Sequence, residues 1–176
     1  MPNKAIQNPC WYCPEIDTAL PMELSPDSDG YLYDEALQTS GCNSLHGIQW
    51  CYEGRTIRIH RHKQRLCGYP SPAFDKVVVV YPLDKIFTEP NNLVIYNPDG
   101  SLHMRPEIPL SCAPKDTWPY TSPIKPLSYL DVHWTKYEGK ITMAIDLELG
   151  LQDALETRIF NPYTGECEDF LYTWKL

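Results

Sequence analysis

Alternation of apolar and polar positions is the clearest pattern in this chain, and it predicts a fold made mainly of antiparallel β-strands. Four stretches each read as two strands joined by a tight turn that contains glycine. These hairpins cover residues 48–62, 92–105, 130–149 and 157–174, and their turns lie at Glu53-Gly54, Asn97-Pro98-Asp99-Gly100, Glu138-Gly139 and Asn161 to Gly165. The apolar run "KVVVVYPL" at residues 76–83 predicts a further, buried strand.

Helical patterns are few and short. Residues 28–41 predict one helix, because Asp29 can cap its start and Gly41 can end it. Residues 82–89 and 149–156 each favour a single helical turn. The helical content is therefore expected to be small, and it adds only minor elements to a fold dominated by strands.

The chain length fits one domain that spans residues 1–176. Residues 1–28 lack periodicity and predict an extended arm, and residues 106–126 hold six prolines and predict a long irregular connection. Seventeen prolines in total shorten the regular elements, and twelve tyrosines favour strands. The predicted fold class is α+β, mainly antiparallel β, as a meandering sheet or sandwich of hairpins with one or two short helices.

Charge is unevenly distributed along the chain, whose net charge is −8. Residues 1–50 carry seven acids and one base, and residues 127–176 carry nine acids and four bases. Residues 51–76 are the exception, with six bases and two acids. Acidic ends argue against a general nucleic-acid binder, because they would repel phosphate. A basic protein partner would instead be attracted.

The seven cysteines include one C-x2-C pair, Cys10 and Cys13. A second pair with this spacing, which a typical structural zinc site would have, is absent from the sequence. A mixed zinc site remains open, in which Cys42 and either His46 or Cys51 complete the ligand set. Structural thiols are the competing interpretation. A redox dithiol is disfavoured, because no strand pattern precedes the pair and no helix pattern follows it.

The stretch "RIHRHK" places His60 and His62, together with Arg58, on one face of a predicted strand. Two histidines at this spacing can share a metal ion, and a small hydrolase built on them is a second alternative. A charged edge strand that resists aggregation explains the same pattern without chemistry. The third ligand of such a metal would come from His46, His103 or His133.

Acidic and aromatic side chains gather in the last quarter of the chain, and this composition is typical of a surface that binds a basic protein. A solvated face of a sheet has the same composition. The predicted partner-binding residues are Asp146, Glu148, Glu166, Glu168, Asp169, Tyr172 and Trp174.

The sequence carries neither a G-x-S-x-G nucleophile motif nor a glycine-rich phosphate loop. In its short length, acidic charge and tyrosine-rich hairpins, the chain resembles small bacterial antitoxin or immunity proteins. The resemblance is one of composition and does not extend to a motif. It implies a non-enzymatic protein-binding domain that neutralises or masks a basic partner such as a nuclease toxin.

Three further expectations concern cofactors, other binding partners and cellular location. No cofactor is expected apart from zinc in the alternative already described. No direct contact with nucleic acid is expected, because of the acidic charge. No contact with a membrane is expected, since no apolar run approaches the roughly 20 residues that span a bilayer. The first residues lack a basic and then apolar leader, so the protein is expected to be cytoplasmic, or else to be a mature chain from which a leader has been removed.

Overall fold

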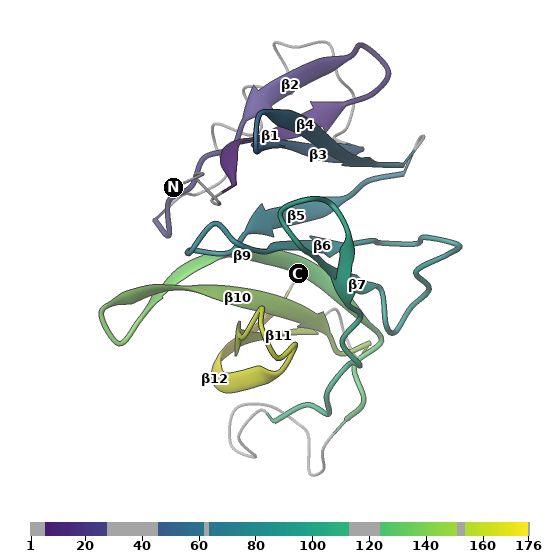
Figure 1. Ribbon diagram of the computed structural model, residues 1–176. Helices are drawn as coiled ribbons and strands as arrows, with labels where there is room; N and C mark the ends of the chain where they lie inside the picture. The colour runs from purple at the N-terminus through teal and green to yellow at the C-terminus, as the bar shows by residue number, and fades with distance from the viewer. Residues whose placement is uncertain (1–5, 28–45, 62–63, 113–123, 151–153, 176) are drawn as a thin grey trace.

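The computed structural model shows a protein of β-strands arranged in three layers (Figure 1). Its described residues form twelve strands, in three antiparallel sheets of four strands each, and no helix. Accordingly, no described segment is a helix that could cross a membrane. The prediction of mainly antiparallel β structure is confirmed. The structure describes residues 6–27, 46–61, 64–112, 124–150 and 154–175.

The predicted helices are not found in this part of the chain. Residues 28–41, expected to form the main helix, lie outside the described residues. Residues 82–89 form turns and bends in place of a helical turn. In the third candidate, residues 149–156, the strand β11 (Ala154–Phe160) begins at Ala154. The prediction of a helical turn is therefore wrong for residues 154–156.

Sheet A lies at the N-terminal end of the stack, and its strands follow the order β2-β1-β3-β4. The segment expected to be an extended arm contains the β1–β2 hairpin, and β1 is an inner strand that pairs with both β2 and β3. Trp11 of β1 is buried in the core between sheets A and B. The strands are β1 (Gln7–Cys13), β2 (Thr18–Pro21), β3 (Gly47–Tyr52) and β4 (Arg55–His60).

Sheet B is the middle layer, with its strands in the order β5-β6-β7-β8. The valines of β6 alternate between its two faces. Val77 and Val79 belong to the core shared with sheet A, whereas Val78 and Val80 belong to the core shared with sheet C. A strand covered on both faces needs an unbroken apolar run, which explains the four valines. The strands are β5 (Cys67–Pro70), β6 (Val77–Val80), β7 (Leu93–Tyr96) and β8 (Leu102–Met104).

Sheet C has its strands in the order β12-β11-β10-β9, and both of its hairpins are the ones predicted. Its two-residue turn at Glu138 and Gly139 has φ angles of 49° and 75°, nearly the same as the 49° and 73° of the Glu53-Gly54 turn in sheet A. Both turns need left-handed residues, which is why glycine occupies the second position. The strands are β9 (Ser128–Tyr137), β10 (Lys140–Glu148), β11 (Ala154–Phe160) and β12 (Cys167–Lys175).

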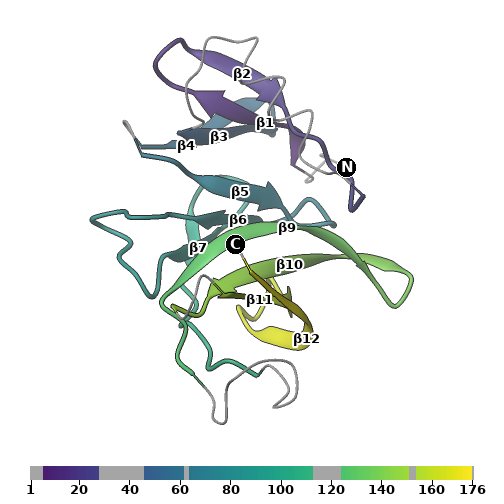
Figure 2. The same cartoon turned by 180° about the vertical axis from the view of Figure 1, so that it is seen from behind.

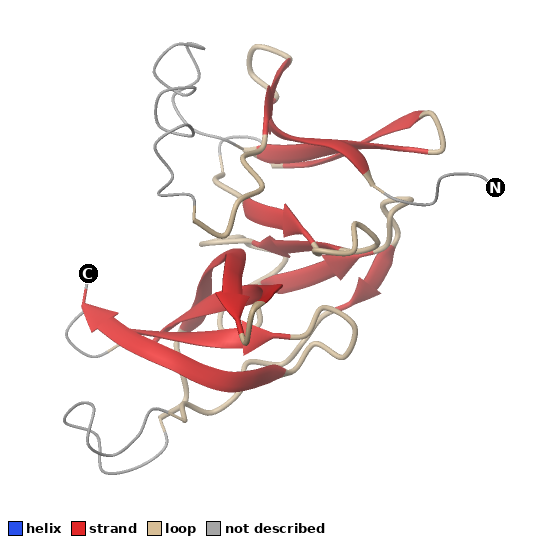
Figure 3. Cartoon of the chain, turned by 90° about the vertical axis from the view of Figure 1, so that its left-hand side faces the viewer, coloured by secondary structure: helices blue, strands red, loops and turns tan. Residues whose placement is uncertain are grey.

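Sheet C curls back on itself. Although β9 and β12 are its two outer strands, the Tyr137 hydroxyl of β9 donates a hydrogen bond of 2.9 Å to Asp169 of β12. Figure 3 shows the last strand, which ends near the C label, as a strongly bent ribbon. The face turned away from sheet B is therefore partly enclosed, and Ala144, Leu155 and Thr157 on that face are fully buried.

Polar side chains tie the three layers together. The indole N–H of Trp50 in sheet A donates to the carbonyl of Pro98, and that of Trp134 in sheet C donates to the carbonyl of Pro70. Asn92, next to β7, exchanges two hydrogen bonds with the backbone of Tyr129 in sheet C. Because each of these groups has a hydrogen-bond partner, the contacts join the layers without leaving a polar side chain buried and unsatisfied.

Candidate functional site

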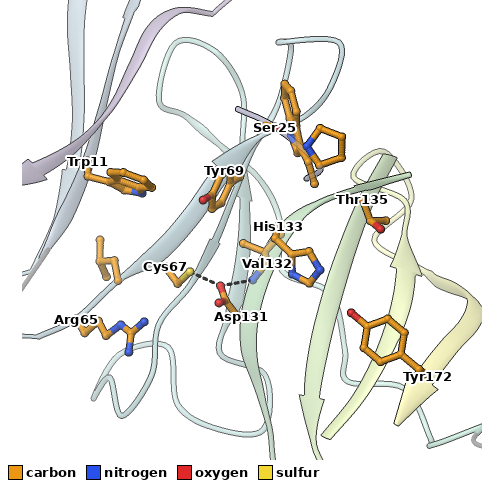
Figure 4. A pocket seen from close by; sticks show the side chains of 13 residues that line it. Trp11, Ser25, Arg65, Cys67, Tyr69, Asp131, Val132, His133, Thr135 and Tyr172 are labelled. Atoms are coloured by element: carbon orange, nitrogen blue, oxygen red, sulfur yellow. Dashed lines mark hydrogen bonds between the residues drawn. The ribbon is translucent and has the colours of Figure 1, made fainter. Parts of the chain in front are cut away.

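A pocket of about 410 Å³ opens where the outer strand of sheet B meets the outer strand of sheet C. These two strands, β5 and β9, are neighbours in Figure 1 and again in the reverse view of Figure 2. Trp11 of β1, the segment at Ser25 and Tyr172 of β12 complete the wall. The pocket thus draws on all three sheets, and Figure 4 shows its lining.

The Cys67 thiol and the Asp131 carboxylate are in direct contact in the pocket wall (Figure 4). The thiol donates to Oδ1 of Asp131, which also accepts the N–H of Val132 over 2.6 Å. Burial raises the pKa of Cys67 well above its ordinary value, and the charge of Asp131 raises it further. The thiol therefore stays protonated and acts as a hydrogen-bond donor. Since only a thiolate is a strong nucleophile, this environment does not activate Cys67 for nucleophilic attack.

A bulge in β9 positions Asp131. Asp146 of β10 pairs with Asp131, and the next residue, Leu147, pairs with Tyr129, so Leu130 is an extra residue in β9. Such bulges bend a strand and redirect a neighbouring side chain. Here the bulge lies at the point where the Asp131 side chain reaches across to β5.

Asp131 begins a polar row that crosses the curled face of sheet C. Thr157 donates a hydrogen bond of 2.6 Å to Oδ1 of Asp146, and Nδ1 of His133 lies 4.0 Å from Oδ2 of Asp146. Burial raises the pKa of Asp146, an effect opposed by the Thr157 hydrogen bond and by His133. The register aligns Asp131, Asp146, Thr157 and Tyr172 across the four strands.

Two opposite charges in the pocket have no ion-pair partner among the described residues. Arg65, exposed and two residues before Cys67, forms no hydrogen bond or ion pair with another described residue. The second carboxylate oxygen of Asp131 likewise accepts no hydrogen bond from the rest of the described chain. Aromatic walls with a few unpaired polar groups are typical of sites that bind small molecules.

The predicted zinc ligands differ in their bonding partners, and one of them lies outside the described residues. Cys13 is disulfide-bonded, and the other described cysteines, including Cys10, are free, so its partner lies outside the described residues. Cys42 also lies outside them. His46 contacts Glu15, with 2.6 Å between Nδ1 and Oε1. The described residues hold no group of three metal-binding side chains. The zinc site stays a prediction for a reduced chain, because a disulfide sulfur is not a thiolate ligand.

The charged face of β4 is occupied by its own neighbours. The Arg58 guanidinium lies 4.5 Å from the centre of the Tyr12 ring and forms an ion pair of 3.2 Å with Asp17. The His60 ring packs edge-on against the same tyrosine. His62 lies outside the described residues, so a hydrolase site built on the two histidines stays an untested prediction.

The structure separates the predicted partner-binding residues. Asp146 is buried, and Glu148 is half-buried and accepts a hydrogen bond of 2.8 Å from the Ser128 hydroxyl. These two carboxylates therefore differ in exposure from the rest of the described set. The Trp174 side chain lies outside the described part of the structure. The exposed members of the set are Glu166, Glu168, Asp169 and Tyr172.

Sequence patterns gave no functional role to Arg65, Cys67 or Asp131, although these residues form one wall of the pocket. β5 carries only four residues, too few for a periodic signal. The alternation of apolar and polar residues does not predict the bulge at Leu130 either. Trp11 was visible as an aromatic residue between two cysteines, but nothing in the sequence placed it beside Tyr69, whose ring centre lies 6.4 Å from its own.

Comparisons of the chain with protein-family models, with curated proteins and with solved structures found no match. A function is therefore inferred from the geometry and charge of this chain's own residues.

Proposed function

We propose that this chain is a non-enzymatic protein-binding domain that neutralises or masks a basic protein partner, in the manner of a bacterial toxin-immunity protein. The observation that carries the proposal is an acidic edge made of Glu166, Glu168 and Asp169. All three side chains are exposed. Glu166 immediately precedes β12, and Glu168 and Asp169 lie in its first three residues, on an outer strand of sheet C. An acidic edge on a chain of net charge −8 attracts a basic partner and speeds its association.

The backbone and two carboxylates of the acidic edge are held in place. Asn161 donates a hydrogen bond of 2.9 Å to Glu168, and Tyr137 donates one of 2.9 Å to Asp169. The guanidinium of Arg158 donates to the backbone carbonyls of Cys167 and Glu168. Groups that are already ordered lose less conformational entropy when a partner binds, so this edge is suited to recognition.

Two exposed tyrosines belong to the strand and turn that carry the acidic edge. Tyr163, in the turn before β12, is 47% exposed, and Tyr172, within β12, is 49% exposed. Tyrosine is enriched among the residues that dominate binding energy at protein interfaces. Under this proposal, the acids steer the partner and the aromatic rings contribute the close contacts.

The location of the protein is a separate part of the proposal. A cytoplasmic protein that masks a toxin would act before the toxin is exported. The disulfide at Cys13 is more typical of an oxidising compartment. Thiol labelling of Cys13 in intact cells tests this point, because a cytoplasmic protein is expected to present it as a reduced thiol.

The proposal is tested by co-expressing the chain with the product of the adjacent open reading frame. A basic product that co-elutes with the chain in size-exclusion chromatography, and whose activity is inhibited in the complex, is the expected result. Failure to form a complex with that product contradicts the proposal.

Charge reversal identifies the binding surface. A triple variant, Glu166→Lys with Glu168→Lys and Asp169→Lys, is expected to lose the complex at moderate salt. Its matched control carries the same change of net charge at three other exposed acids. Equal losses in the two triples would mean that net charge, rather than the acidic edge, drives binding. The control triple is Glu53→Lys, Glu89→Lys and Glu107→Lys.

A further inference from the structure

The pocket between β5 and β9 holds one positive and one negative side chain that do not pair with each other. Arg65 and the second carboxylate oxygen of Asp131 make no hydrogen bond or ion pair with other described residues. Figure 4 shows these two side chains on either side of the Cys67 sulfur. A ligand that carries both charges would satisfy both residues at once, because each would meet its opposite.

A small zwitterion can bridge two opposite charges that line one pocket. The nitrogen and the carboxyl carbon of an α-amino acid are about 2.5 Å apart, as their two covalent bonds dictate. A charge-assisted hydrogen bond of about 2.8 Å at each end gives a bridge of about 8 Å. Arg65 lies two residues before Cys67, and Cys67 contacts Asp131, so both charges belong to the same wall of the pocket.

One part of the remaining wall is suited to an apolar or aromatic side chain. Trp11 and Tyr69 pack edge to face, with their ring centres 6.4 Å apart, and both line the pocket. Trp134 lines it as well. Rings in such an arrangement favour contact with a further ring. The volume of about 410 Å³ lies within the range of roughly 300–1,000 Å³ that is typical of small-molecule sites.

We propose that this pocket binds a free α-amino acid with an aromatic or large apolar side chain. The ligand carboxylate binds the Arg65 guanidinium, and the ligand ammonium binds the second oxygen of Asp131. The ligand side chain packs against Trp11 and Tyr69. This activity goes beyond the proposed protein-binding function, and it does not depend on that function.

Calorimetric titration of the full chain with four probes tests the proposal. L-phenylalanine carries both charges and a ring, and it is expected to bind saturably. Phenethylamine lacks the carboxylate, 3-phenylpropionate lacks the ammonium, and free glycine lacks the ring. Each of these three is expected to bind at least about ten-fold more weakly, since each loses one class of contact.

Two variants assign the charges. Arg65→Gln is expected to abolish the preference for L-phenylalanine over phenethylamine, while leaving its preference over 3-phenylpropionate. Asp131→Asn is expected to show the reverse pattern, and its amide oxygen can still accept the Cys67 and Val132 hydrogen bonds. The matched controls are Arg55→Gln and Glu89→Gln, which neutralise exposed charges outside the pocket.

Three results of these titrations would contradict the proposal. No saturable binding of L-phenylalanine at about 10 mM would overturn the proposal. Equal affinity for L-phenylalanine and its singly charged analogues would overturn it too, because the two unpaired charges would then have no role. Binding lost equally in the pocket variants and in the controls would place the ligand elsewhere. Since no protein partner enters these titrations, their result is independent of whether the acidic edge binds a basic protein.

Discussion

Two groups of carboxylates in sheet C have opposite environments. Asp146 and Glu156 are buried and accept hydrogen bonds from neighbouring hydroxyl or N–H groups. Glu166, Glu168 and Asp169 are exposed at the edge of the same sheet. The residue types are alike, and the two groups lie on adjacent or nearby strands. What differs is whether the side chain is enclosed by the layers and the curl of the sheet.

This difference separates structural roles from recognition. A buried carboxylate must keep its hydrogen-bond partners, since an unpaired charge inside a protein is costly. An exposed carboxylate contributes little to stability and remains available to a partner. The same sheet can therefore use one group to hold its own layers together and the other to bind a second protein.

The largest expected effect concerns Glu156, which is fully buried. It accepts hydrogen bonds from Ser111 and from the backbone of Cys112, and it lies 3.9 Å from Arg158. Glu156→Ala leaves that buried cation without its acid and is expected to lower the free energy of unfolding by about 3–5 kcal/mol. Glu168→Ala is expected to change it by at most about 0.5 kcal/mol. Urea denaturation measures both, and similar losses would remove the distinction.

The next effect is a dependence of stability on pH. The raised pKa of Asp146 means that the folded protein holds this proton more tightly than the unfolded chain does. Its contribution favours folding at low pH and is lost as the pH rises from the ordinary aspartate value, about 4, through the raised one.

The variant Asp146→Asn removes this titration and keeps an oxygen for the Thr157 hydrogen bond. Relative to the variant, the wild type is expected to become less stable as the pH rises through that window. Denaturation at a series of pH values measures the difference, with the exposed neutralisation Glu166→Gln as a baseline. A difference that does not change with pH would show that Asp146 is not desolvated as described.

The smallest effect extends the comparison to two thiols beside carboxylates. Cys67 is half-buried beside Asp131, whereas Cys112 is exposed beside Glu156. Burial raises the pKa of both thiols, and it raises that of Cys67 well above its ordinary value. Iodoacetamide is expected to label Cys112 at least about ten-fold faster than Cys67 in the native protein, because Cys67 is less exposed and is held protonated more strongly. Mass spectrometry of the labelled peptides reports the two rates. Faster labelling of Cys67 would mean that the pocket activates its thiol.

The sequence predicted the hairpins well, because their turns and alternation are local signals. The Glu53-Gly54 and Glu138-Gly139 turns occur where expected, since glycine supplies the left-handed residue that each needs. The β1–β2 hairpin was missed because Pro9 and Pro14 interrupt its pattern. For the middle layer, the sequence predicted a buried strand from the run of four valines. No local sequence signal predicted which sheets cover its two faces.

The site was harder to predict because its parts come together only in the folded chain. Asp146 and Glu148 do alternate onto one strand face, as predicted. That face is partly enclosed because Tyr137 meets Asp169 across the curled sheet, a contact between residues 32 positions apart. The pocket depends on a bulge in β9 and on strands from three sheets, neither of which a periodic pattern records.

The central claim is that the acidic edge, and not the chain's net charge, recognises a basic partner. The most direct test is the association rate with the adjacent-gene product at several salt concentrations. Neutralising the edge with Glu166→Gln, Glu168→Gln and Asp169→Asn is expected to slow association about ten-fold at low salt. The difference is expected to vanish near 1 M salt, where screening acts within about 3 Å. Equal rates for this variant and for a triple of Glu53→Gln, Glu89→Gln and Glu107→Gln would contradict the claim.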